Sequence, residues 1–215
     1  MNKDLIKRIL SSLLMLPILF FIIIKGGYFF ILFLIICLII SLIEWKNMQI
    51  NSVVKNFGIF FICLSFYSAY ILRFTDNSTS LYNFLFIILI CIYTDIGGFV
   101  FGKILKGPKL TIISPNKTYA GAIGGFFFSV VFLYLTLSFV SFFDNYKVIF
   151  NIKNIIYIIF LSLISQIGDL IISYFKRISK IKDTGNLIPG HGGILDRIDG
   201  MIFVFPSALI INLYL

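Results

Sequence analysis

The sequence predicts an all-helical protein that crosses a membrane several times, and two properties of its composition support this prediction. Of the 215 residues, 60% are apolar and only 13% are charged, whereas about 25% of the residues in a soluble domain are charged. Long apolar runs follow one another, and runs of roughly 17 to 25 residues match the hydrocarbon core of a bilayer. We therefore expect a single polytopic membrane domain over residues 1–215.

Seven apolar runs can be drawn along the chain. They cover residues 9–24, 28–43, 57–72, 82–102, 121–143, 154–175 and 201–215. Several of them have only 15 or 16 residues, which is short for a helix that spans a bilayer. We therefore expect about seven transmembrane helices, with six and eight as the alternatives.

The distribution of basic residues predicts the orientation, because cytoplasmic loops carry an excess of Lys and Arg. With a cytoplasmic N-terminus, 14 of the 18 basic residues lie in the N-terminal tail and in segments 44–56, 103–120 and 176–199. The protein is then expected in a bacterial-type inner membrane, with segments 103–120 and 176–199 at the cytoplasmic face. Since this asymmetry explains most of the net charge of +9, nucleic acid is not expected as a partner.

Polar chemistry is concentrated in residues 173–200, which hold the only histidine and three of the nine acidic residues. Asp196 and Asp199 stand three apart at the start of an apolar run, so a helix would point both carboxylates the same way. Such a pair suits Mg²⁺, which takes one or two carboxylates together with substrate phosphate. The alternative is a solvated first turn, where acids favour the helix N-terminus.

Glycines surround His191 just before this expected helix. Gly190, Gly192 and Gly193 would let backbone N–H groups approach a phosphate closely. The alternative is an ordinary turn between two spans. His191 could donate a hydrogen bond to phosphate or act as an acid or base, or it could be structural.

Two further carboxylates, Asp95 and Asp169, fall inside apolar runs. An ionisable residue there costs about 2.5 to 3.5 kcal/mol on insertion scales and indicates function. The alternative is a polar group satisfied by a neighbouring helix. Upstream of a Gly-rich helix start, Ser114 and Lys117 also fit phosphate binding, although Gly121 and Gly125 have the spacing of close helix packing.

These residues form a pattern that resembles the signature of the phosphatidate cytidylyltransferases, also called CDP-diacylglycerol synthases. The positions that match in register are Ser173, Lys176, Arg177, Lys182, Asp183, Pro189, His191, Gly192, Gly193, Asp196, Arg197 and Asp199. Asp95, Phe101-Gly-Lys, Ser114-Pro, Lys117-Thr and Gly168-Asp-Leu extend the resemblance upstream. Before Asp95, only Arg8 and Glu44-Trp45 resemble the family. Two positions depart from its pattern, because Asn116 stands where Lys is frequent and Ala120 where Glu is frequent.

The resemblance implies an enzyme that transfers a cytidylyl group from CTP to phosphatidic acid, giving CDP-diacylglycerol and pyrophosphate with Mg²⁺. It implies metal binding by Asp169, Asp196 and Asp199. The implied catalytic set is Asp169, Lys182, Asp183, His191, Asp196, Arg197 and Asp199. The implied substrate-binding set is Asp95, Ser114, Lys117, Lys176, Arg177, Gly192 and Gly193.

Two other functions compete with this interpretation. A CTP-dependent lipid or polyprenol kinase would share the basic loops, the metal and the nucleotide. A secondary transporter would bind ions through carboxylates at the bilayer midplane, but the acidic residues here cluster at one end of the apolar runs and no two halves look alike. The sequence leaves open whether a monovalent cation joins Mg²⁺ and whether the protein forms a homodimer.

Overall fold

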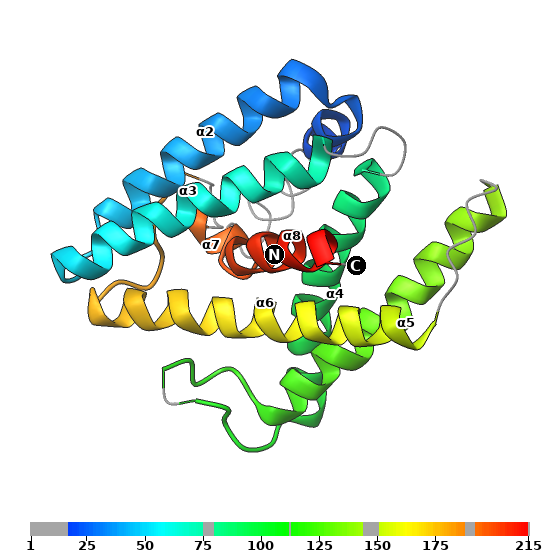
Figure 1. The fold of residues 1–215 in the computed structure, drawn as a ribbon. Coiled ribbons are helices and arrows are strands. Elements are labelled where there is room, and N and C mark those ends of the chain that lie inside the picture. The colour runs from blue at the N-terminus through cyan, green and yellow to red at the C-terminus, as the bar shows by residue number, and fades with distance from the viewer. Residues whose placement is uncertain (1–16, 75–79, 112, 144–150, 188–191, 215) are drawn as a thin grey trace, which may run out of the picture.

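The structure, a computed structural model, describes residues 17–74, 80–111, 113–143, 151–187 and 192–214. A helix over residues 17–25 comes first. It is followed by α2 (Gly27–Lys46), α3 (Ser52–Phe74), α4 (Ser80–Leu105), α5 (Tyr119–Phe143), α6 (Ile152–Ile178), α7 (Leu195–Ile198) and α8 (Met201–Tyr214) (Figure 1).

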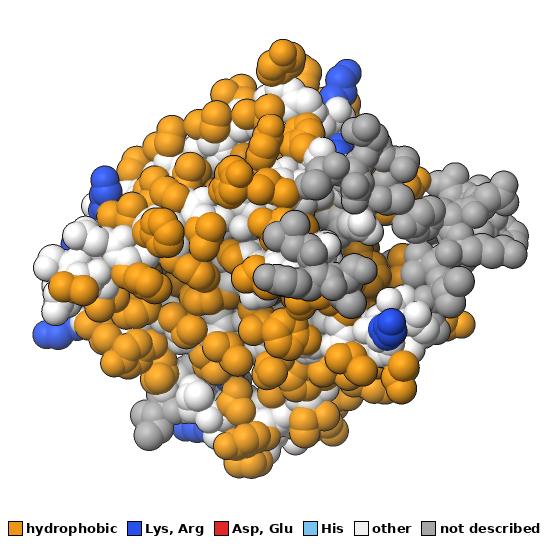
Figure 2. All heavy atoms as spheres, viewed as in Figure 1, with side chains coloured by type: hydrophobic (Ala, Val, Ile, Leu, Met, Phe, Trp, Pro, Cys, Tyr) orange, Lys and Arg blue, Asp and Glu red, His pale blue; other side chains and the backbone are white. Residues whose placement is uncertain are grey.

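Five of these helices, α2 to α6, are long and apolar enough to cross a membrane. The runs that looked short become adequate because their helices include polar ends, so that α2 has 20 residues and α3 has 23. Helix α8 has only 14 residues and contains Pro206. Hydrophobic side chains cover most of the face drawn in Figure 2, and the Lys and Arg side chains lie near its edges. The prediction of a polytopic helical membrane protein is confirmed, whereas the count of seven spans stays a prediction.

The first helix ends at a glycine pair that leaves room for an arginine. Gly26 has φ +62°, and a Cβ there would lie 2.7 Å from Nη2 of Arg73. The Arg73 guanidinium, near the end of α3, donates to the Ile23 carbonyl oxygen from Nε at 3.2 Å and from Nη2 at 3.0 Å. A cation bonded to a terminal carbonyl stabilises the C-terminal end of a helix, so Arg73 ties the first helix to α3.

Buried apolar side chains form two clusters. The larger one joins the first helix and α2, α3, α4, α5, α6 and α8, and it includes Phe30, Ile87, Leu133, Ile158 and Val204. The smaller one holds Trp45, Met48, Ile62, Ile172, Leu195 and Ile202. Because Leu195 begins α7, this second cluster anchors the short helix that carries Asp196 and that Asp199 follows.

Helices α4 and α5 touch through their backbones. A Cβ on Gly121 of α5 would lie 2.7 Å from the carbonyl oxygen of Gly98, and a Cβ on Gly97 would lie 2.6 Å from that of Gly124. Since a methyl group does not fit at these distances, the glycines allow the two helices to approach closely. This contact supports the packing interpretation of Gly121 rather than a phosphate site.

Three connections lie toward the left side of Figure 1: the turn between α2 and α3, the loop from Lys106 to Thr118, and the segment that joins α6 to α7. The loop after α4 folds back on itself, because Lys109 and Thr118 form an isolated antiparallel bridge and the Tyr119 N–H donates to the Pro108 carbonyl oxygen at 3.2 Å. The polar segments that the sequence singled out are thus gathered at one end of the helices.

Candidate active site

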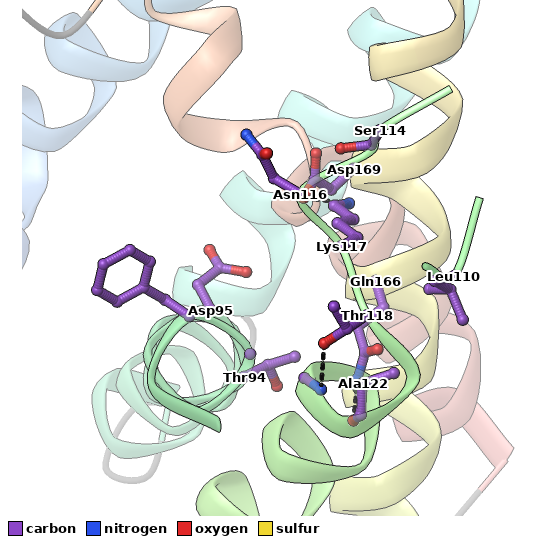
Figure 3. Close-up of a pocket in the computed structure, with 13 residues that line it drawn as sticks. Thr94, Asp95, Leu110, Ser114, Asn116, Lys117, Thr118, Ala122, Gln166 and Asp169 are labelled. Atoms are coloured by element: carbon purple, nitrogen blue, oxygen red, sulfur yellow. Dashed lines mark hydrogen bonds and ion pairs between the residues drawn. The ribbon is translucent and has the colours of Figure 1, made fainter. Parts of the chain in front are cut away.

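A pocket of about 360 Å³ opens between α4, α5, α6 and the loop before α5. Its polar lining residues are Thr94, Asp95, Ser114, Asn116, Lys117, Thr118, Gln166 and Asp169 (Figure 3). Four of the predicted site residues, Asp95, Ser114, Lys117 and Asp169, therefore line one cavity although three segments far apart in the sequence supply them.

Backbone hydrogen bonds hold the loop side of this pocket. The Lys117 N–H donates to the Ser114 carbonyl oxygen at 3.0 Å, and the Leu110 N–H donates to the Lys117 carbonyl oxygen at 2.8 Å. Thr118 Oγ1 accepts a hydrogen bond from the Gly121 N–H at 3.0 Å, which is the geometry of a helix N-cap. These bonds direct the side chain of Lys117 into the pocket (Figure 3).

Lys117 and Asp169 form an ion pair across the pocket, with 2.5 Å between Nζ and Oδ2. Ser173 Oγ, one turn further along α6, donates to Asp169 Oδ1 at 3.2 Å. The two charged side chains stay 26% and 29% exposed, so both remain accessible to a molecule in the pocket. Asp95 on α4 points toward this pair from the opposite wall (Figure 3).

Asp199 interacts electrostatically with Asp169 and Asp95. Burial and these two negative charges raise its pKa well above the ordinary value for aspartate, while Lys176 and a hydrogen bond from the Gly200 N–H act in the opposite direction. Three acidic residues from α4, α6 and the α7–α8 junction therefore repel one another. In the described part of the chain, no three His, Cys, Asp or Glu side chains come close enough to hold a metal ion together.

Asp196, three residues before Asp199, has different surroundings. Its Oδ1 accepts from Lys176 Nζ at 2.9 Å, and its Oδ2 accepts from the N–H groups of Thr184 at 2.8 Å and Gly193 at 3.0 Å. Burial would raise the pKa of Asp196, but the hydrogen bonds and the charge of Lys176 lower it below its ordinary value. Both oxygens are thus occupied by donors, and metal binding by Asp196 stays a prediction.

Local structure explains why glycine stands at positions 192 and 193, before α7. Gly192 has φ +84°, a conformation that favours glycine. A Cβ on Gly193 would overlap the carboxylate of Glu44, and the Gly193 N–H already donates to Asp196. Phosphate binding by these glycines stays a prediction.

The remaining predicted residues surround this region. Lys182, Asp183 and Arg197 are exposed, and exposed Arg177 donates to the Ile181 carbonyl oxygen at 3.2 Å. His191 lies outside the described residues.

Sequence reasoning assigned no role to three residues that the structure brings into this region. Gln166 Nε2 donates to the Ala122 carbonyl oxygen at 3.2 Å and so ties α6 to α5. Glu44 and Thr184 share a buried hydrogen bond of 2.7 Å. An acidic residue directly after an apolar run, at a position that resembles the family pattern, is the signal that could have identified Glu44. Thr184 carries no comparable signal.

Fold and pocket together define an integral membrane protein whose acidic and basic side chains meet in a cavity at one end of its helices. The chain belongs to the cytidylyltransferase family, which it matches over residues 50–215. The resemblance found in the sequence is therefore confirmed.

Curated relatives carry a consistent name. The phosphatidate cytidylyltransferase of Staphylococcus aureus (strain COL) is 44% identical over 131 residues, which cover 60% of this chain and 48% of that protein. The one from Staphylococcus haemolyticus is 40% identical over 134 residues, covering 62% and 50%. The matches thus span about half the length of these relatives. The phosphatidate cytidylyltransferase of Rickettsia bellii is 36% identical over 221 residues, covering 100% of this chain and 94% of that protein.

Proposed function

We propose that this protein transfers the cytidylyl group of CTP to phosphatidic acid, giving CDP-diacylglycerol and pyrophosphate. The observation that carries the proposal is the match to the Rickettsia bellii phosphatidate cytidylyltransferase over the whole chain. The pocket agrees with it, since Lys117 and Asp169 are both partly exposed within one cavity. A cation that a ligand can reach suits a substrate that carries phosphates, and a carboxylate beside it suits the Mg²⁺ that binds such phosphates.

The chemistry needs no side-chain nucleophile. A phosphate oxygen of phosphatidic acid attacks the α-phosphorus of CTP and forms the new P–O bond. The bond from the α-phosphorus to the oxygen bridging to the β-phosphorus breaks, and pyrophosphate leaves with that electron pair. Catalysis then consists of positioning the two phosphate groups and neutralising the developing charge.

Basic residues would supply part of this neutralisation. Lys117 would hold one phosphate group in the pocket, with Ser114 beside it. The exposed Lys182, Arg177 and Arg197 would attract the triphosphate and the leaving pyrophosphate. Lys176 is paired with Asp196. Its positive charge would mainly offset the negative charges of Asp196 and Asp199.

The acidic residues fit Mg²⁺. A hard cation prefers carboxylate oxygens and needs only one or two of them when substrate phosphates complete its shell. Burial and the repulsion from Asp169 raise the pKa of Asp199, and a cation between these two carboxylates would relieve the repulsion. We therefore propose these two carboxylates as ligands of Mg²⁺, which would neutralise phosphate charge. A monovalent cation and a homodimer stay predictions.

The reaction would take place at the cytoplasmic face of a bacterial inner membrane, where CTP is available. Single cysteines placed at exposed positions 106 and 182 of a variant without Cys37, Cys63 and Cys91 would test this orientation. An impermeant maleimide added to intact cells should leave both positions unlabelled and should label both in opened vesicles. Strong labelling of either position from outside would contradict the orientation.

Radiolabelled CTP tests the reaction itself, using the purified protein in detergent with phosphatidic acid and Mg²⁺. Label at the α-phosphorus should enter the chloroform-soluble lipid, whereas label at the γ-phosphorus should appear as water-soluble pyrophosphate. Diacylglycerol should not replace phosphatidic acid. Transfer of the γ label into lipid would reject cytidylyl transfer and would indicate a lipid kinase.

A further inference from the structure

A buried carboxylate on α2 bonds to the start of α7. Glu44 lies near the C-terminal end of α2 and is 6% exposed. Its Oε1 accepts from the Ile194 N–H at 3.0 Å, and its Oε2 accepts from the Leu195 N–H at 2.8 Å and from Thr184 Oγ1 at 2.7 Å. Three donors from residues 140 to 151 positions later in the chain therefore converge on one side chain.

The segment around Glu44 is shaped to admit this carboxylate. A Cβ on Gly185 would lie 2.8 Å from Oε1, and a Cβ on Gly193 would overlap both carboxylate oxygens. The Thr184 hydroxyl lies 2.7 Å from Glu44 Oε2 and 3.1 Å from Asp196 Oδ2. The two glycines thus leave room for the Glu44 carboxylate. The Thr184 hydroxyl connects this carboxylate on α2 to Asp196.

Removing the carboxylate would take away the acceptor of the Ile194 and Leu195 N–H groups, whereas the Thr184 hydroxyl could still donate to Asp196 Oδ2. An unsatisfied buried donor costs about 1 to 3 kcal/mol, so the loop would move to recover hydrogen bonds elsewhere. Asp199 follows Leu195 by one helical turn, and its position relative to Asp169 depends on where α7 begins. The bonds of Glu44 therefore fix the geometry of the acidic residues without contacting them.

From these contacts we infer that Glu44 is a positioning residue for the reaction proposed above. It holds the start of α7 so that Asp199, which follows α7, stays within electrostatic range of Asp169. Glu44 itself lies before residues 50–215, the part of the chain that matches the family model. The inference rests on the proposed function, and its test combines a readout that needs no substrate with one that needs turnover.

The first readout follows the loop. Asn186 is exposed and lies two residues after Thr184, so a spin label on a cysteine at this position reports the motion of the segment. In electron paramagnetic resonance spectra, Glu44→Gln should convert the label from an immobile to a mobile component. A label at Lys103, which is exposed near the end of α4, should be unchanged and serves as the control.

The second readout is kinetic. Loss of a residue that orients catalytic groups typically lowers activity about 10- to 100-fold. Glu44→Gln keeps the size of the side chain but replaces one accepting oxygen with an NH₂ group, so we expect kcat to fall about 10- to 100-fold while the KM for CTP changes far less. Glu44→Asp keeps the charge and should retain more activity than Glu44→Gln.

A matched pair at Thr184 covers the case in which Glu44→Gln does not fold. Thr184→Val keeps the shape and removes the hydroxyl, whereas Thr184→Ser keeps the hydroxyl and removes a methyl group. We expect Thr184→Val to mobilise the label and lower kcat more than Thr184→Ser does. Ser41→Ala removes a buried hydrogen bond of 2.7 Å to the Cys37 carbonyl oxygen on the same helix and should leave the label immobile and kcat unchanged.

Two results would overturn the inference. One is an unchanged label at position 186 in both Glu44→Gln and Thr184→Val. The other is a mobile label with kcat within about twofold of the wild type, which would make Glu44 a structural residue only. If the wild-type protein turned over no CTP, the proposed function would fail, and the label would still decide whether Glu44 holds the loop.

Discussion

Asp196 and Asp199 stand three residues apart, yet their surroundings are opposite. Donors occupy both oxygens of Asp196, including Lys176 and the Gly193 N–H, and its pKa is lowered. Asp199 is half-buried beside other negative charges, and its desolvation together with these charges raises its pKa. A satisfied carboxylate stabilises the fold in its ionised form, whereas a carboxylate held against like charges costs stability and is a candidate for function. Proximity in sequence therefore does not imply a shared role.

The largest effect is expected for Asp196→Asn. This change leaves Lys176 without its ionic partner in a site where the side chains are 11% and 5% exposed, and removing one partner of a buried pair costs about 3 to 5 kcal/mol. The melting temperature in detergent should fall clearly, and activity should fall at least about 100-fold, the scale for loss of an important electrostatic group. Unchanged thermal stability would contradict the conclusion that the hydrogen bonds of Asp196 stabilise the fold.

Asp199→Asn should instead affect activity alone. The substitution removes one of three repelling charges, so the melting temperature should stay the same or rise. Cytidylyl transfer should fall at least about 100-fold, because a ligand for the proposed Mg²⁺ is lost. The melting temperatures of the two variants distinguish a stabilising role of Asp196 from a functional role of Asp199. An equal loss of stability in both variants would contradict this distinction.

Gly193→Ala should lower the stability of the fold by less than Asp196→Asn does. It affects the surroundings of Asp196, because the Gly193 N–H donates to that residue. The new methyl group would overlap the carboxylate of Glu44, and such overpacking typically costs about 1 to 3 kcal/mol. Gly98→Ala is the matched control, because a Cβ there would meet its nearest neighbour, the Gly121 carbonyl oxygen, at 3.8 Å. Thermal melts of the two variants should differ, with only Gly193→Ala destabilised.

The smallest effect is expected for Ala120→Glu, which restores a residue frequent in the family. Position 120 lies in the first turn of α5, and the carboxylates proposed to hold Mg²⁺ come from α6 and the α7–α8 junction. Activity should therefore stay within about twofold of the wild type, a change of less than roughly 0.5 kcal/mol in the barrier. A gain of tenfold or more in a CTP turnover assay would show that an acid is missing from this site.

Much of the fold could be predicted because hydrophobicity alone identifies apolar helices. The helix boundaries could not, since Ser52 and Lys46 are polar residues that lengthen helices beyond their apolar runs. The pairing of Asp169 with Lys117 was only partly foreseeable: both residues were singled out, but their contact depends on how α6 packs against α5. Glu44 was noticed in the resemblance to the family, but its role could not be predicted because its partners lie 140 or more residues away in the chain.

The backbone contact between α4 and α5 has a mechanical consequence. Helices that meet through Gly97, Gly98 and Gly121 interlock so closely that sliding or tilting one past the other would force atoms into overlap. Asp95 and the helix that follows Lys117 are therefore held in one stiff unit, and Gln166 bonds α6 to this unit through the Ala122 carbonyl oxygen at 3.2 Å. The Lys117–Asp169 ion pair is a second link between α6 and this unit.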